Sequence, residues 1–128
     1  IGFSPTLASR IYAGADLFLM PSVSEPCGLA QMIALRYGTI PVVRSTGGLR
    51  DTIHAYDPST GKGNGITFES VNAHDMLDAV RRACALYNDG PSFARMRDNG
   101  FRSDFSWKGS TKHYLQLYEG LLTKQETP

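Results

Sequence analysis

Short apolar runs interrupt the chain at three places, and the segments between them carry apolar residues at helical spacing. The runs cover residues Leu17–Met20, 40–43 and 65–69. The first two are continuous, as in buried strands, and the third alternates between apolar and polar residues. They predict three β-strands. Pro41 is expected near the start of its strand or at a sheet edge, because proline has no N–H to donate.

Six helices are predicted from the remaining pattern. They cover residues 5–13, 29–37, 49–54, 72–87, 91–99 and 107–122. Ser4 is the expected N-cap of the first helix, and Pro5 suits its first position. Gly38 and Gly100 are expected to end the second and fifth helices, since glycine readily adopts the left-handed conformation of a helix C-terminus.

Two of these helices carry an apolar stripe. On the helix over 72–87 the stripe is Leu77, Val80, Cys84 and Tyr87, which predicts that Cys84 lies in the core. On the last helix the stripe consists of Trp107, Thr111, Tyr114, Tyr118 and Leu121. Such a stripe needs a surface to pack on.

The alternation of strand and helix predicts an α/β fold with a parallel sheet and helices on both of its faces. Three strands are few for such a sheet, so one edge is expected to be open. The chain also begins at Ile1, without an initiator methionine. We therefore interpret residues 1–122 as part of a larger domain, residues 57–65 as a surface loop, and residues 123–128 as a disordered tail.

Composition narrows the classes of function. The chain has 128 residues, of which 41% are hydrophobic, and a formal net charge of +1. That charge argues against a dedicated nucleic-acid binder and against an anionic membrane surface. No apolar stretch is long enough to span a bilayer. Two cysteines cannot form a disulfide framework, which favours a reducing compartment.

Two turns follow predicted strands and open helices. Ligands of open α/β sheets gather at the carboxyl ends of strands, and a helix N-terminus attracts anions. Residues 22–28 (SVSEPCG) and 44–48 (RSTGG) occupy such places. Together they suit a phosphorylated ligand, although glycine and serine also occur in ordinary turns between strand and helix.

Other candidate groups carry weaker signals. Glu25 is either an acid that favours the helix dipole or a carboxylate that faces a sugar. Cys27 is a packing or ligand-contact residue rather than a nucleophile, because no histidine adjoins it in the sequence. Residues 61–65 (GKGNG) lack the order of a phosphate loop. The three histidines have no metal-ligand spacing.

Several motifs together resemble bacterial glycogen synthase and plant starch synthase. They are AGAD (13–16), EPCGLAQ (25–31), LRYG (35–38), VRSTGGLRDT (43–52) and DFSW (104–107). The resemblance covers essentially the whole chain. It implies the latter part of the C-terminal, donor-binding domain of a two-domain (GT-B type) glycosyltransferase, with a partial Rossmann-like parallel sheet.

The resemblance implies a retaining enzyme that moves glucose from ADP-glucose to the non-reducing end of an α-1,4-glucan. Glu25 matches the active-site glutamate of the family. Residues matching donor-binding positions are Phe3, Cys27, Gly28, Leu29, Ala30, Gln31, Thr46, Gly47 and Gly48. Ala30 stands where many relatives have Thr, and Phe3 where Tyr often stacks on the base. Ile33 replaces a second glutamate found in other branches. No metal or other cofactor is implied.

The implied partners are ADP-glucose or ADP, an α-1,4-glucan acceptor and an N-terminal domain, in the cytoplasm of a bacterium. No nucleic acid or membrane is expected. The alternatives are the donor domain of a related UDP-glucose-dependent enzyme, or a non-catalytic module that binds a glucan or a partner protein. The chain alone is expected to be inactive, and its open sheet edge favours self-association.

Overall fold

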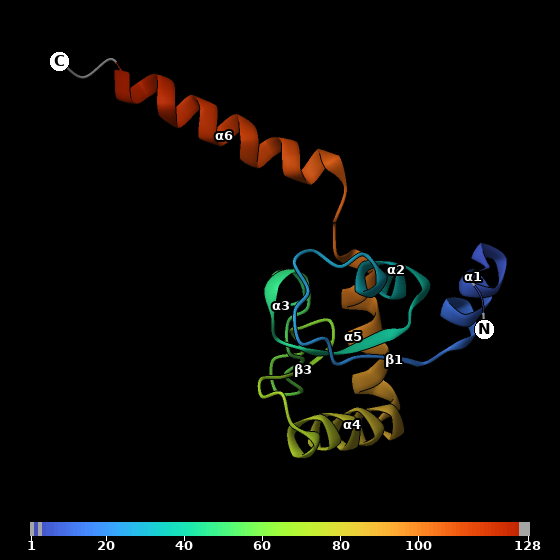
Figure 1. Cartoon of the computed structure of the whole chain (residues 1–128). Helices are drawn as coiled ribbons and strands as arrows, with labels where there is room; N and C mark the ends of the chain where they lie inside the picture. The colour runs from blue at the N-terminus through green and yellow to red at the C-terminus, as the bar shows by residue number, and fades with distance from the viewer. Residues whose placement is uncertain (1, 3, 126–128) are drawn as a thin grey trace.

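The computed structural model describes residue 2 and residues 4–125, with side chains up to residue 122. Helices and strands alternate along it as predicted (Figure 1). The elements are α1 (Pro5–Gly14), β1 (Leu17–Met20), α2 (Ala30–Tyr37), β2 (Ile40–Arg44), α3 (Gly47–Thr52), β3 (Ile66–Phe68), α4 (Ala73–Asn88), α5 (Gly90–Arg102) and α6 (Trp107–Gln125).

The three strands form one parallel sheet in the order β1-β2-β3. This confirms the predicted α/β class. Pro41 is the second residue of the central strand and pairs with Phe18 in register, so it lies near the strand start as expected. Within the described residues, β1 and β3 each keep one unpaired edge.

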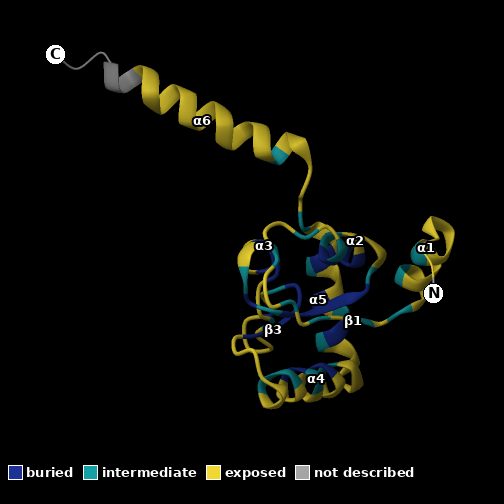
Figure 2. Cartoon of the chain, in the orientation of Figure 1, coloured by how far each residue is buried: buried dark blue, intermediate teal, exposed yellow. Residues whose placement is uncertain are grey.

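Helices cover both faces of the sheet. Alternate residues of β2 point to opposite faces, so the central strand contributes to an apolar cluster on each. Ile40 and Val42 join the larger apolar cluster with residues of β3, α4 and α5. Val43 joins the smaller cluster on the other face with Leu35 of α2 and Leu49 of α3. Figure 2 shows the buried residues gathered in this layered body.

Two predicted helix ends are confirmed, the start of α1 at Ser4 and the end of α2 at Gly38. The Ser4 hydroxyl accepts a hydrogen bond from the N–H of Leu7, with Pro5 at the first position of α1. Gly38 ends α2 in the left-handed conformation, with φ of 81°. The buried Thr39 then donates from its hydroxyl to the carbonyl of Ala15 at 2.8 Å, which ties the end of α1 to the sheet.

The buried face of α4 differs from the prediction. Ala79 and Ala83 are its fully buried residues, and Met76 and Leu86 pack beside them. Leu77, Tyr87 and Cys84 are exposed, so the assignment of Cys84 to the core is wrong. The stripes 76-79-83-86 and 77-80-84-87 are adjacent on one helix, and small alanines let α4 approach the sheet more closely than the larger residues would.

This correction can be tested by unfolding experiments. Met96 of α5 is fully buried in the larger cluster, so Met96→Ala should lower the free energy of unfolding by about 2–5 kcal/mol. Cys84→Ala should change it by no more than about 0.5 kcal/mol, because the side chain is exposed. Urea titrations of both variants measure the difference. A Cys84→Ala loss comparable to that of Met96→Ala would contradict the observed face.

Two further boundaries, and the burial of one strand, differ from the prediction. Gly100 does not stop α5 but lies buried inside it, where an added Cβ would come 2.8 Å from Leu35 Cδ2. The short helix α3 begins at Gly47, two residues before the predicted start. Strand β1 is only partly buried, and Leu19 is exposed on it.

The segment over 57–65 is not wholly a surface loop. Asn64 is buried, and its side-chain amide donates to the carbonyl of Thr52 at 3.0 Å and to the hydroxyl of Ser103 at 3.1 Å. The amide of Asn99 donates to the carbonyls of Gly61 and Gly63. The second half of this segment is therefore fixed to α3 and α5, while residues 57–60 are exposed as predicted.

Helix α6 projects away from the layered body (Figure 1) and is exposed along almost all of its described length (Figure 2). Trp107 keeps 83% of its surface, and Tyr114, Tyr118 and Leu121 are also exposed. The predicted stripe thus has no packing surface within the described residues. The helix continues to Gln125, so the first three residues of the predicted tail are helical, and residues 126–128 lie outside the described residues.

Candidate functional site

Two connections meet at the carboxyl edge of the parallel strands. Residues 21–29 follow β1 and lead into α2, and residues 45–46 follow β2 and lead into α3. The carboxyl edge is where open α/β sheets bind ligands. The sheet thus brings together the two turns that the sequence singled out.

The two turns are in direct backbone contact. The N–H of Gly48 donates to the carbonyl of Glu25 at 2.9 Å. A Cβ added at Gly48 would lie 1.9 Å from the carbonyl oxygen of Cys27, and one at Gly47 would lie 2.1 Å from that of Glu25. No side chain fits between these backbones, so both glycines are required by close approach.

Gln31 lies behind the first turn rather than on its surface. Its side chain is fully buried, and its amide nitrogen donates to the carbonyl of Gly28 at 2.9 Å and to the hydroxyl of Thr52 at 3.1 Å. That hydroxyl donates in turn to the carbonyl of Gly48 at 2.6 Å. Gln31 and Thr52 therefore link the turn before α2 to the turn before α3.

The buried amide also explains the glycine at position 28. Gly28 has φ of +71°, and an added Cβ would come 2.5 Å from Oε1 of Gln31. That oxygen is buried and has no hydrogen-bond partner among the described residues. Position 28 must therefore be glycine for its backbone angle as well as for space.

The carbonyls of the first turn point inward, and its N–H groups remain available. The N–H groups of Cys27, Gly28 and Leu29 donate to no acceptor among the described residues. Leu29 is the N-cap of α2 and keeps 67% of its surface exposed. Free donors at the start of a helix suit an anionic group.

Glu25 is the acidic side chain within the first turn. It is partly buried, and its Oε2 accepts a hydrogen bond from the Ser22 hydroxyl at 3.3 Å. Its own carbonyl is held by Gly48, so the backbone of this residue is fixed between the two turns. The carboxylate thus lies within the same connection as the free N–H groups.

The other predicted site residues fall into three groups. Thr46 is the N-cap of α3 without a side-chain capping bond, and Ala30 is the first residue of α2. Cys27 is exposed and is a free thiol. Phe3 lies outside the described residues. Their proposed contacts with a ligand stay predictions.

Two residues of this edge have contacts that the sequence does not predict. Arg44 ends β2 and donates to carbonyls of the first turn, and Thr52 completes the link from Gln31. Both occur within the 43–52 motif that carries the resemblance. Their partners lie about twenty residues away in the chain, and nothing in the local pattern indicates such contacts.

The carboxylates with shifted pKa values lie elsewhere. The pKa values of Asp57, Asp75 and Asp104 are lowered, chiefly by side-chain hydrogen bonds involving Ser59, Ser70 and Ser106 respectively. All three stabilise turns at the surface. Among the described residues, no three His, Cys, Asp or Glu side chains are grouped so as to hold a metal ion.

A groove of about 510 Å³ opens beside the site. Leu29, Met32, Ile33 and Arg36 form one side of it, and residues 103–106 form the other. It therefore follows the exposed face of α2 from the first turn toward the segment that precedes α6.

In the part of the chain that the structure describes, none of the helices has the length and apolar character needed to cross a membrane.

Fold and site together define a class of protein. A parallel sheet with two glycine turns and two helix starts at its carboxyl edge is the arrangement of a Rossmann-like domain. The chain belongs to the family of glycosyl transferases group 1, whose model matches residues 1–102. The sheet corresponds to part of a GT-B glycosyltransferase domain.

Individual relatives agree with this assignment. The chain is 55% identical over 126 residues to the glycogen synthase of Geobacillus thermodenitrificans and 52% identical over 122 residues to that of Desulfitobacterium hafniense. These matches cover 98% and 94% of the chain. In each case the chain spans 26% of the relative.

A solved structure is similar as well. It is the catalytic domain of starch synthase IV from Arabidopsis thaliana, bound to ADP and acarbose. The match has a TM-score of 0.82 and 40% sequence identity, and it covers 93% of this chain and 25% of that one.

Proposed function

We propose that residues 1–122 are the latter part of the nucleotide-sugar-binding domain of a retaining glycogen or starch synthase. The whole enzyme would transfer glucose from ADP-glucose to the non-reducing end of an α-1,4-glucan. One observation carries this proposal: the two glycine turns form a single backbone unit that presents Glu25 and free N–H groups together. The glycogen synthase relatives support the choice of reaction.

The proposed roles follow from the chemistry of the site. The N–H groups of Gly28 and Leu29, with the dipole of α2, stabilise negative charge on the departing diphosphate. Glu25 orients the glucose or stabilises the positive charge that develops on it in an oxocarbenium-like transition state. The acceptor attacks from the face that the diphosphate leaves, which retains the configuration of the sugar.

Part of the machinery would come from the rest of the enzyme. We assign the acceptor site, and basic residues that hold the diphosphate, to segments outside this sequence. The exposed stripe of α6 would pack on the N-terminal domain, which accounts for apolar side chains that the described residues leave uncovered. The chain alone is therefore expected to lack transferase activity.

The donor and the setting are finer points of the proposal. ADP-glucose is favoured over UDP-glucose by the starch synthase neighbour, which was solved with ADP. Ile33, in place of a second glutamate, favours the starch and glycogen synthase branch over sucrose- or trehalose-type enzymes. We place the enzyme in the bacterial cytoplasm because its relatives are bacterial and both cysteines are free.

A second candidate is a non-catalytic module that binds a glucan or a partner protein. The observation that favours it is the uncovered aromatic face of α6. Self-association through that face or through the free edge of β1 belongs to the same candidate. It predicts binding or assembly that is independent of Glu25 and of the two turns.

The test is a titration of the 128-residue chain with ADP, followed by backbone amide shifts. The donor-site proposal predicts that Gly28, Leu29 and Gly48 shift saturably, because the first two carry free N–H groups and Gly48 is hydrogen-bonded to the same turn. Adenosine, which lacks phosphates, should leave these amides in place, and UDP compares the two bases. Absence of shifts in the chain and also in a full-length enzyme that contains it would contradict the proposal.

A further inference from the structure

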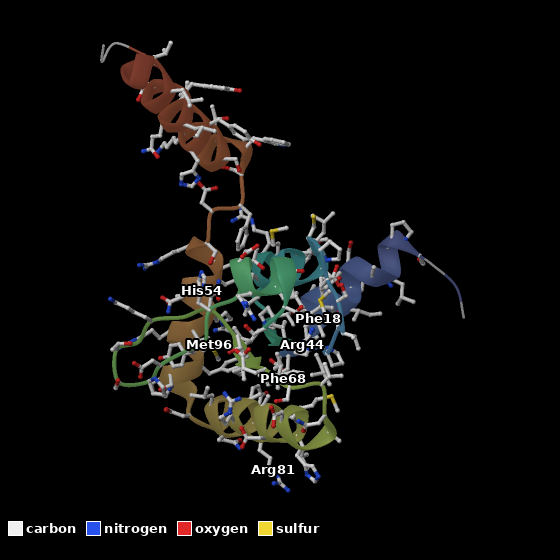
Figure 3. The ribbon with its side chains drawn as sticks, turned by 60° about the vertical axis from the view of Figure 1, so that its left-hand side comes forward. Phe18, Arg44, His54, Phe68, Arg81 and Met96 are labelled. Carbon is white, nitrogen blue, oxygen red and sulfur yellow. The ribbon has the colours of Figure 1, made fainter. Side chains whose placement is uncertain are left out.

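Arg44 occupies a fixed position at the carboxyl edge. It is the last residue of β2, the central strand, and its Cα pairs in register with Phe68 of β3 (Figure 3). The preceding residue, Val43, pairs with Met20 of β1. The backbone at Arg44 is therefore anchored by the sheet, and its side chain extends from a rigid base.

The guanidinium group binds three backbone carbonyls. Nε donates to the carbonyl of Ser22 at 2.8 Å, and Nη1 donates to that of Glu69 at 3.3 Å. Nη2 donates to the carbonyl of Val23. Two of these carbonyls belong to the turn after β1 and one to the end of β3. A planar group with fixed N–H directions suits such a set of acceptors.

These bonds reach Glu25 through its neighbours. Arg44 holds the backbone of Ser22, and the hydroxyl of Ser22 donates to Oε2 of Glu25. Gly48 holds the carbonyl of Glu25 from the other side. Glu25 is thus tied to the central strand through Arg44 and to α3 through Gly48, with no carboxylate paired to Arg44 among the described residues.

We propose that Arg44 is a positioning residue, which sets the placement of the Glu25 carboxylate by fixing the start of the turn that carries it. The inference rests on the proposed function, because it takes Glu25 as the group that acts on the glucose. Hydrogen bonds from a charged donor are among the stronger ones in proteins. Small misplacement of a group at the reacting centre lowers rates steeply.

Arg44→Lys is the informative substitution. Lysine keeps the positive charge, but its single ammonium group cannot bind the carbonyls of Ser22, Val23 and Glu69 in one plane. In a full-length enzyme that contains this segment, Arg44→Lys should lower kcat by about 10- to 100-fold. The KM for ADP-glucose should change by less than about threefold, because the free N–H groups of the turn are untouched.

Further variants test whether Arg44 acts on Glu25 through Ser22. Ser22→Ala removes only the hydroxyl that donates to Glu25, and it should lower kcat up to about tenfold. Combined with Arg44→Lys, its effect should be less than multiplicative, because both act through the same carboxylate. Arg82→Lys is the matched control: Arg82 also donates to a β3 carbonyl, that of Thr67, but on α4 away from the turn. It should leave kcat within twofold.

Each outcome is decisive. A raised KM with unchanged kcat would make Arg44 a direct ligand of the diphosphate and overturn the proposal. A lowered melting temperature with unchanged kcat and KM would reduce Arg44 to a structural role, which also overturns it. If Glu25→Ala lowers kcat and Arg44→Lys does not, the positioning role alone is wrong. If Glu25→Ala has no effect either, the proposed function fails and the inference fails with it.

Discussion

Replacing Glu25 by alanine is expected to lower the turnover of a full-length enzyme that contains this segment by roughly 10²- to 10³-fold. That is the usual cost of removing one preorganised group that stabilises developing charge. The loss should appear in kcat, because the carboxylate acts on the transition state rather than on the diphosphate. Initial rates of glucose incorporation from ADP-glucose measure it.

The same substitution should hardly affect folding. Among the described residues, the Glu25 carboxylate accepts one hydrogen bond, from the Ser22 hydroxyl at 3.3 Å, and the bond from Gly48 to its backbone carbonyl survives. We expect the free energy of unfolding to change by less than about 1 kcal/mol. Asp98→Ala is the control, since Asp98 is an exposed carboxylate of α5, outside both turns. Turnover near the wild-type value in Glu25→Ala would exclude the proposed role.

Gly48→Ala is expected to produce the second large effect, this time on the structure. Its added Cβ would lie 1.9 Å from the carbonyl oxygen and 2.5 Å from the carbonyl carbon of Cys27. Both are backbone atoms, so the overlap can be relieved only by moving the two turns apart. We expect a loss of about 1–3 kcal/mol in the free energy of unfolding. Thermal unfolding of the 128-residue chain measures it as a melting temperature lowered by several degrees.

Gly90→Ala is the control for this prediction. Gly90 begins α5, and an added Cβ would meet nothing within 4 Å. The substitution should leave stability unchanged or raise it by up to about 1 kcal/mol, because alanine has less freedom to lose on folding. Amide spectra should also show Gly48→Ala perturbing residues 25–28. Equal melting temperatures and unchanged spectra for both variants would show that the turns are not in contact.

Local signals in the sequence were sufficient for most of the fold. Ser4 with Pro5 marks a helix start by chemistry that needs no distant partner, and Gly38 marks a helix end in the same way. The first two apolar runs are continuous, as in strands buried on both faces of a parallel sheet, and the third is indicated by its alternation. These features depend on a residue and its near neighbours, so they can be read without knowing the tertiary structure.

The predictions that were wrong concern positions where more than one local structure suits the sequence and tertiary packing determines which one forms. On α4, two adjacent stripes have suitable spacing, and the sheet packs on the one with alanines at 79 and 83. Gly100 has the features of a helix stop, but Leu35 of another helix occupies the space that a side chain would need. Neither outcome follows from a single helix considered alone.

For the candidate site, the sequence predicts where the turns lie but not the hydrogen bonds that hold them. Glu25 and the two glycine turns were expected at one edge because the carboxyl ends of parallel strands meet there. The hydrogen bonds that hold them join residues far apart in sequence, such as Gln31 to Thr52 and Arg44 to Ser22. Gln31 was expected to touch the ligand, whereas its side chain is buried beneath the turn, so a supporting role is now the better hypothesis.

The backbone contact between Gly47–Gly48 and residues 25–27 has a consequence for protein engineering and for divergence. Because no side chain separates the turns, an altered backbone path in one requires a matching change in the other. In a chimera that takes only residues 45–48 from a distant relative, the backbone of the second turn would no longer match that of residues 25–27. We therefore expect the two connections to diverge together, and changes of donor preference to occur among the side chains around them.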